Sequence, residues 1–118
     1  MAKCEEGYLC SVCGRDVESL VDSDLYLRFV IGEVDPETLH TQPERHIRCN
    51  PTLAQFVVAA HFSPVEVTGD FDKRELDPQF VAERESLLTR GWQRLKDLAE
   101  LDVPVNEYPL PEFHGKWN

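Results

Sequence analysis

The sequence predicts a small single domain of the α+β class, with a hairpin and short strands in its N-terminal half and two main helices at about 51–61 and 78–101. Two observations predict this class. A run rich in β-branched and aromatic residues occupies 24–31, and apolar residues recur at helical spacing in both later segments. The chain has 118 residues, of which 42% are hydrophobic and 29% charged, which is typical of one domain with a modest core.

Short strands are predicted at three places before the long helix. Residues 8–20, YLCSVCGRDVESL, are predicted to form two strands around a tight turn, in which Gly14 is free to take a positive φ. The run DLYLRFVI at 24–31 lacks a clean helical period, so a strand is expected there. PVEVTGDF at 64–71 is predicted to be a strand that enters a turn at Gly69, with a loose connection as the alternative.

Helix starts are predicted where Asp or Asn precedes proline, because the first residue can cap a helix and proline suits the first helical position. Asp35-Pro36 predicts a short helical turn. Asn50-Pro51 begins the predicted helix at about 51–61.

The predicted helix at about 78–101 follows Asp77, its candidate cap. Its apolar face comprises Phe80, Val81, Leu87, Leu88, Trp92, Leu95, Leu98 and Leu101. Gly91 lies on the same face, where glycine costs stability relative to alanine unless another element packs closely against it, and where a kink is the alternative expectation.

The end of the chain is predicted to be an extended tail. Residues 102–118, DVPVNEYPLPEFHGKWN, contain three prolines and no hydrophobic period. We therefore expect a single domain at 1–103 and an extended, proline-containing tail at 104–118. The apolar and aromatic side chains of this tail could dock on a partner or on the domain itself.

The four cysteines indicate a metal site rather than disulfides. The N-terminus MAKCEEGYLC has neither the basic nor the apolar region of a secretory signal, and no stretch approaches the roughly 18 consecutive apolar residues of a membrane span. We therefore expect a cytoplasmic protein without a membrane segment. In a reducing cytosol, clustered cysteines favour metal binding or catalysis over disulfides.

Two residue pairs have the spacing of metal ligands. Cys10-x-x-Cys13 is followed by glycine, as in a zinc knuckle, and His46-x-x-Cys49 supplies a second pair at the same internal spacing. Cys49 also precedes the predicted helix start, whose dipole would favour a thiolate. The sequence thus predicts that these four residues bind zinc, with Cys4 as an alternative ligand in place of His46. His40 and His114 are lesser candidates, and His61 is expected to be structural.

At these residues the chain resembles a treble-clef or zinc-ribbon-like domain, over about residues 8–61. The resemblance rests on the knuckle CSVCG and on the ligands HIRCNP at the start of a helix, and it implies that both share one zinc ion. The chain departs from the usual pattern in the long insert between the ligand pairs and in the surplus Cys4.

The predicted function is that of an interaction or adaptor module with a structural zinc. Four ligands fill a tetrahedral shell, and thiolates reduce the Lewis acidity that hydrolysis needs. The motifs HExxH, GxSxG and the P-loop are absent, so an enzyme is disfavoured, and Glu44 is expected to be a surface salt-bridging residue rather than a general base. The alternatives are a zinc-dependent hydrolase or nuclease with an open site, and a thiol-based redox or metal sensor that uses Cys4. Iron also suits a thiolate-rich site.

The charge of the chain favours a protein partner over nucleic acid. A net charge of −10 repels phosphate backbones and anionic lipids. Arg45 and Arg48 beside the predicted zinc ligands are the one hint of nucleic-acid binding. The basic residues of the long helix, Arg84, Arg90, Arg94 and Lys96, are predicted to form a solvated face. The identity of the partner and the oligomeric state stay open.

Overall fold

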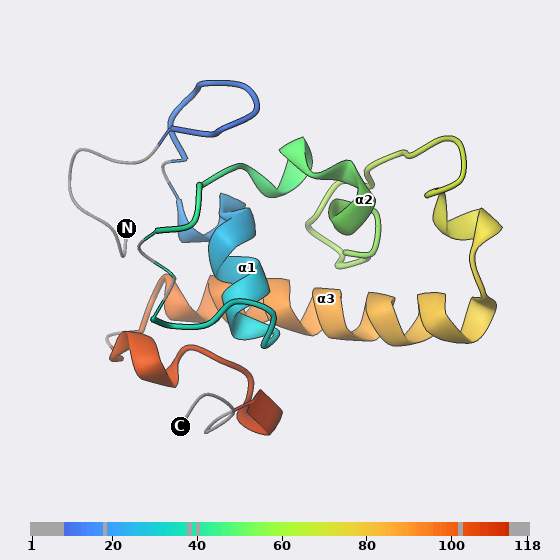
Figure 1. Cartoon of the computed structure of the whole chain (residues 1–118). Helices are drawn as coiled ribbons and strands as arrows, with labels where there is room; N and C mark the ends of the chain where they lie inside the picture. The colour runs from blue at the N-terminus through green and yellow to red at the C-terminus, as the bar shows by residue number, and fades with distance from the viewer. Residues whose placement is uncertain (1–8, 18, 38, 40, 102, 114–118) are drawn as a thin grey trace.

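The computed structural model describes residues 9–17, 19–37, 39, 41–101 and 103–113. In these residues the helices are α1 (Asp24–Val30), α2 (Pro51–Ala54) and α3 (Pro78–Leu98). Short 3-10 turns accompany them at Leu20–Asp22 (η1), Ile47–Cys49 (η2), Lys73–Glu75 (η3), Val105–Glu107 (η4) and Pro111–Phe113 (η5). Figure 1 shows α3 as the longest element, with α1 crossing it.

The prediction of an α+β fold is wrong, because the described residues form helices and no sheet. Extended pairing is limited there to two isolated antiparallel bridges, between Leu9 and Asp16 and between Ser23 and His46. The predicted hairpin at 8–20 is reduced to the first of these bridges, which closes the turn that carries Cys10 and Cys13. The predicted strand at 64–71 is irregular chain.

The run at 24–31, predicted as a strand, forms helix α1. Ser23 caps it, since its Oγ accepts a hydrogen bond from the backbone N–H of Tyr26 at 3.0 Å. Six of the seven helical residues are buried, and Arg28 is the exception. A helix buried on nearly every side needs no polar face, so its sequence has no amphipathic period, and a short apolar run of this kind looks the same as a buried strand.

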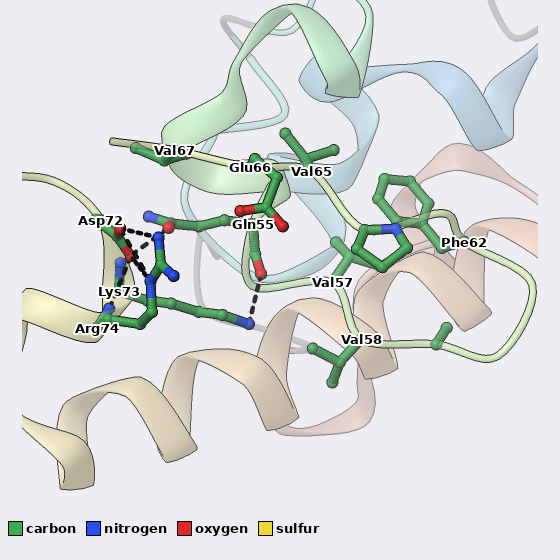
Figure 2. Close-up of a pocket in the computed structure, with 12 residues that line it drawn as sticks. Gln55, Val57, Val58, Phe62, Val65, Glu66, Val67, Asp72, Lys73 and Arg74 are labelled. Atoms are coloured by element: carbon green, nitrogen blue, oxygen red, sulfur yellow. Dashed lines mark hydrogen bonds and ion pairs between the residues drawn. The ribbon is translucent and has the colours of Figure 1, made fainter. Parts of the chain in front are cut away.

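The predicted helix at about 51–61 ends after four residues, as α2. Its start at Pro51 is confirmed, but the side chain of Asn50 does not cap it, and the chain leaves the helical path after Ala54. The buried Gln55 side chain donates to the backbone carbonyl of Phe71 at 2.7 Å, and Figure 2 shows it among the residues that line a neighbouring pocket. The backbone N–H of Val58 donates to the hydroxyl of Thr89 in α3, at 2.9 Å, instead of to a helical carbonyl. The N–H of Val58 thus has a tertiary partner in place of a helical one, and the Gln55 side chain ties the end of α2 to Phe71.

Helix α3 matches the predicted helix closely. It begins at Pro78, where Asp77 caps it by accepting a hydrogen bond from the backbone N–H of Phe80 at 3.0 Å, and it ends at Leu98. The buried part of its apolar face consists of Leu88, Gly91, Trp92, Leu95 and Leu98. Phe80 is 47% exposed, so the N-terminal end of that face is open to solvent.

Gly91 lies where α1 packs against α3, and the helix continues through it. A Cβ atom at this position would lie 2.6 Å from Cγ2 of Ile31 and 3.1 Å from Cδ1 of Leu27. The glycine therefore permits a helix contact that any larger residue would force apart, which explains why a poor helix former occupies a buried helical position.

The described part of the C-terminal segment lies against α1 and α3. The backbone N–H of Leu110 donates to the carbonyl of Val30 at 2.9 Å, at the C-terminal end of α1. The side chain of Arg94 donates to the carbonyls of Tyr108 and Glu107 at 3.1 and 2.9 Å. Residues 103–113 are thus bound to the helical core, whereas the division into a domain at 1–103 and a tail at 104–118 stays a prediction.

The basic residues of α3 make contacts within the chain rather than forming a purely solvated face. Arg84 forms an ion pair with Glu33 at 2.6 Å, and Arg90 forms one with Glu112 at 2.7 Å. Lys96 lies over the ring of Trp92, with its Nζ 5.0 Å from the ring centroid. In the part of the chain that the structure describes, no helix combines the length and apolar character needed to cross a membrane.

We predict that Gly91→Ala destabilises the protein although alanine is the better helix former. The new methyl group would overlap the side chains of α1, and overpacking of this kind costs roughly 1–3 kcal/mol, more than the roughly 1 kcal/mol gained in helix propensity. Urea unfolding followed by circular dichroism measures the difference. The control is Ser86→Ala, an exposed position of the same helix, which should be neutral or slightly stabilising. A Gly91→Ala protein more stable than wild type would show that α1 does not pack closely here.

Candidate metal centre

The fold brings together all four residues of the predicted ligand set. One ligand atom from each of Cys10, Cys13, His46 and Cys49 lies within 4.8 Å of the others. Cys10 is buried, His46 and Cys49 are half-buried, and Cys13 is exposed. The group therefore sits at the surface with one sulfur turned toward the interior, as is compatible with a zinc site.

The first half of the group is the cysteine turn, residues 10–14. Gly14 takes φ +78°, a conformation that favours glycine, and its N–H donates to the carbonyl of Cys10 at 2.9 Å. The backbone N–H groups of Val12 and Cys13 point at the sulfur of Cys10, at 3.4 and 3.5 Å. This is the local geometry expected of a zinc knuckle, in which amides inside the turn stabilise a thiolate.

The second half is the His–Cys turn, residues 46–49, which contains η2. The N–H of Cys49 donates to the carbonyl of His46 at 3.0 Å, and Ile47 between them is 1% exposed and anchors the turn in the core. The backbone N–H of His46 donates to the sulfur of Cys10 at 3.4 Å, so the two turns share that sulfur as an acceptor.

A hydrogen bond from Nε2 to a backbone carbonyl orients the imidazole of His46 toward the sulfurs. Nε2 lies 2.9 Å from the carbonyl oxygen of Asp16. A carbonyl can only accept, so Nε2 carries the hydrogen, and a neutral imidazole then has its lone pair on Nδ1. Nδ1 lies 3.3 Å from the sulfur of Cys13 and 3.8 Å from that of Cys49. A backbone carbonyl that fixes the tautomer in this way is typical of metal-binding histidines.

The pKa values of Cys10 and His46 are set by burial and by neighbouring hydrogen-bonding groups. Burial raises the pKa of the Cys10 thiol, but the three backbone amides that point at its sulfur outweigh burial and lower the pKa to about 6. Burial of the imidazole lowers the pKa of His46, but the carbonyl of Asp16 and the sulfurs of the cysteine turn outweigh it and raise the pKa. The most negative part of the site is therefore the buried sulfur.

Cys49 does not have the lowered pKa that a helix N-terminus was expected to provide. Burial, and then the neighbouring sulfurs of Cys10 and Cys13, raise its pKa to about 11. Helix α2 is only four residues long and offers little dipole. A positive ion among the sulfurs is what would hold Cys49 as a thiolate.

The two sulfur–nitrogen distances within the group are compatible with a tetrahedral zinc site. Zinc–sulfur and zinc–nitrogen distances of about 2.3 and 2.0 Å place neighbouring ligand atoms roughly 3.5–3.8 Å apart. The two sulfur–nitrogen distances of 3.3 and 3.8 Å lie close to that range, and three sulfurs with one imidazole form a donor set that suits zinc.

Of the other candidate residues, the structure describes His61. Cys4, His40 and His114 lie outside the described residues. His61 is exposed and borders a separate hollow beside Trp92.

Glu44 is not the surface salt-bridging residue that the sequence suggested. It is 3% exposed, and its carboxylate accepts hydrogen bonds from the Ser23 hydroxyl at 2.9 Å and from the backbone N–H groups of Leu25 and Arg45. The backbone carbonyl of Glu44 accepts a hydrogen bond from the N–H of Ser11 at 2.8 Å, which joins Glu44 to the cysteine turn.

Sequence reasoning missed a second buried carboxylate, that of Asp24. It is 0% exposed and carries ion pairs to Arg28 and Arg45. The i,i+4 spacing of Asp24 and Arg28 is the signal that could have found it, but that signal has meaning only on a helix, and this segment was predicted as a strand.

The surface beside the metal-ligand group is hollowed. A depression of about 430 Å³ is bordered by Cys13, Arg15, Asp22, Arg48, Cys49 and Phe62, among others. The guanidinium of Arg48 lies over the ring of Phe62, 4.3 Å from its centroid. No protein-family model, no curated protein and no solved structure matches this chain.

We predict that Cys49→Ser abolishes tight zinc binding and that Cys4→Ser does not. Loss of Cys49 removes one of the four clustered donor atoms, whereas Cys4 is the surplus cysteine. Zinc per chain, measured by elemental analysis after dialysis against a weak chelator, should be about one for wild type and Cys4→Ser and close to zero for Cys49→Ser. Loss of zinc from Cys4→Ser with retention in His46→Ala would identify Cys4 as the fourth ligand instead.

Proposed function

We propose that this chain is a zinc-binding protein in which Cys10, Cys13, His46 and Cys49 hold one structural zinc ion, and that it acts as a protein-interaction module. The observation that carries the first part is the approach of the four donor atoms to within 4.8 Å. Bound zinc would supply a cross-link between the cysteine turn and the His–Cys turn, which lie more than thirty residues apart in the sequence. We keep the treble-clef resemblance only as a proposal for these two turns, without the hairpin of that fold.

A structural role is favoured over a hydrolytic one by the completeness of the donor set. Hydrolytic zinc keeps one position for water, whereas four protein ligands here fill a tetrahedral shell. Glu44, the carboxylate that the sequence offered as a base, is buried and is hydrogen-bonded at the start of α1. The cysteines of the group are all free thiols, in keeping with the cytoplasmic location that we propose.

The first experiment is metal analysis with X-ray absorption at the zinc edge, on protein purified without added metal. We expect one zinc with three sulfur ligands and one nitrogen ligand. Chelation should lower the thermal unfolding midpoint, and added zinc should restore it, since a ligand bound only to the folded state stabilises by about 2.7 kcal/mol at 100 times its Kd. An oxygen ligand would favour the hydrolase instead, and loss of a response to oxidant in Cys4→Ser would favour the sensor.

The interaction role is supported by an apolar hollow of about 520 Å³ between α2, the start of α3 and the chain that connects them. Its apolar lining includes Leu53, Phe56, Phe71, Leu76 and Phe80. Phe71 is 67% exposed and Phe80 is 47% exposed. Two exposed phenylalanines at one depression are uncommon on a surface that has no partner.

The charges around this hollow favour a basic partner. The exposed acidic residues nearest to it in sequence are Asp70, Glu75, Asp77 and Glu83, and none of them has an ion pair among the described residues. The neighbouring cations are already neutralised, Lys73 by Glu85, Arg74 by Asp72 and Arg84 by Glu33. We therefore propose that the occupant is a peptide segment of another protein, with apolar side chains flanked by Lys and Arg.

We predict that a synthetic helical peptide of leucine and lysine binds this hollow and that the same peptide with glutamate in place of lysine does not. Calorimetry should show binding that weakens as salt is raised and that Phe71→Ser/Phe80→Ser reduces at least tenfold. The control is Val58→Ser, an exposed apolar residue outside the hollow. Equal binding by wild type and the double variant would show that the peptide is held by charge alone and would remove the hollow as a docking site.

A further inference from the structure

The most buried charge among the described residues is at the first position of α1. Asp24 is 0% exposed, and four groups approach its carboxylate or its backbone. Oδ2 accepts from Nε of Arg28 and from Nε of Arg45, both at 2.8 Å, and Oδ1 accepts from Nδ2 of Asn50 at 3.0 Å. The backbone N–H of Asp24 donates to the carbonyl of Arg45 at 2.9 Å.

Two partners of Asp24, which we call its metal-side partners, are direct sequence neighbours of the proposed zinc ligands. Arg45 precedes His46, and Asn50 follows Cys49. The carboxylate therefore holds the His–Cys turn at its two ends, one oxygen to each. The bridge between Ser23 and His46 places the same turn alongside the start of α1.

We infer that Asp24 is a positioning residue for the metal centre, which holds His46 and Cys49 where they can meet the two thiols of the cysteine turn. This inference rests on the proposed zinc site. Partners outside the ligand shell set ligand orientation, and their loss typically weakens metal binding about 10- to 100-fold. In addition, a buried carboxylate with two arginines and an amide around it has one favourable arrangement, so it holds its partners in place.

Glu44 links the start of α1 to the cysteine turn, as Asp24 links it to the His–Cys turn. Its carboxylate binds the Ser23 hydroxyl and the N–H of Leu25, and its backbone carbonyl accepts from Ser11 in the cysteine turn. The start of α1 is thus joined directly to the His–Cys turn and, through Glu44, to the cysteine turn.

The experiment compares zinc affinities of Asp24→Asn and Asp72→Asn, measured by competition with a chromogenic chelator on the full chain. Asp72 is the matched control, because it is 7% exposed and paired with Arg74, as Figure 2 shows, but it has no contact with residues 45–50. We expect zinc binding 10- to 100-fold weaker in Asp24→Asn and unchanged in Asp72→Asn. Unfolding midpoints with zinc bound report the loss of stability in each variant separately.

Two further variants distinguish positioning from general stability. Asn50→Ala removes the contact on the metal side of Asp24, and Arg28→Gln removes the contact on the helix side. Asn50→Ala should weaken zinc binding more than Arg28→Gln, at comparable unfolding midpoints. The absorption bands of the cobalt-substituted protein should change in Asp24→Asn and Asn50→Ala and stay unchanged in Asp72→Asn.

Each outcome decides one of the proposals. Equal zinc affinity and an unchanged cobalt spectrum in Asp24→Asn would overturn the positioning role while leaving the zinc site intact. If Asp24→Asn does not fold, the comparison of Asn50→Ala with Arg28→Gln decides, and equal affinities would overturn the role. A wild-type protein that binds neither zinc nor cobalt would overturn the proposed function itself.

Discussion

Residues 44–50 connect the cysteine turn, the start of α1 and the hydrophobic core, which are distant in the sequence. The remaining structure depends on how this segment is held. Its first residue, Glu44, is bonded to the cysteine turn and to the start of α1. Arg45 and Asn50 are bonded to the buried carboxylate of Asp24, and Ile47 is buried in the core. The two proposed ligands of the segment, His46 and Cys49, lie between these anchors. The metal-ligand group is thus an extension of the polar network at the start of α1.

This network explains how the described residues, which form no sheet, keep irregular chain in place. Buried polar groups lose stability unless each finds a partner, and here the partners come from segments far apart in the sequence. Asp24 and Glu44 organise the metal-ligand side, and Gln55 organises the chain between α2 and α3 through bonds to Phe71 and Lys73. Helices α1 and α3 pack closely against each other at Gly91. A zinc cross-link would add to this scheme where the core is thinnest, at the half-exposed turns.

The electrostatic character of the surface agrees with a protein partner more than with nucleic acid. Most cations in the described residues are paired with carboxylates or with aromatic rings, so a net charge of −10 is spread over a surface with few free positive groups. Arg45, one of the two residues that hinted at nucleic acid, is used internally by Asp24. The apolar hollow at Phe71 and Phe80 lies at the N-terminal end of α3, away from the basic side chains that hold the C-terminal segment.

The sequence by itself determined the features whose signals are local. The spacing of Cys10, Cys13, His46 and Cys49 predicted the group that the fold brings together, because two short turns carry the ligands in pairs. The pair Asp77-Pro78 and a long apolar period predicted α3, because capping and amphipathicity act within one helix. Only the tertiary structure decided that 24–30 is a helix and that α2 stops after Ala54. A segment buried on nearly every side has no clear period. The chain after α2 is held by hydrogen bonds to Phe71 and Thr89, whose positions no local pattern reveals.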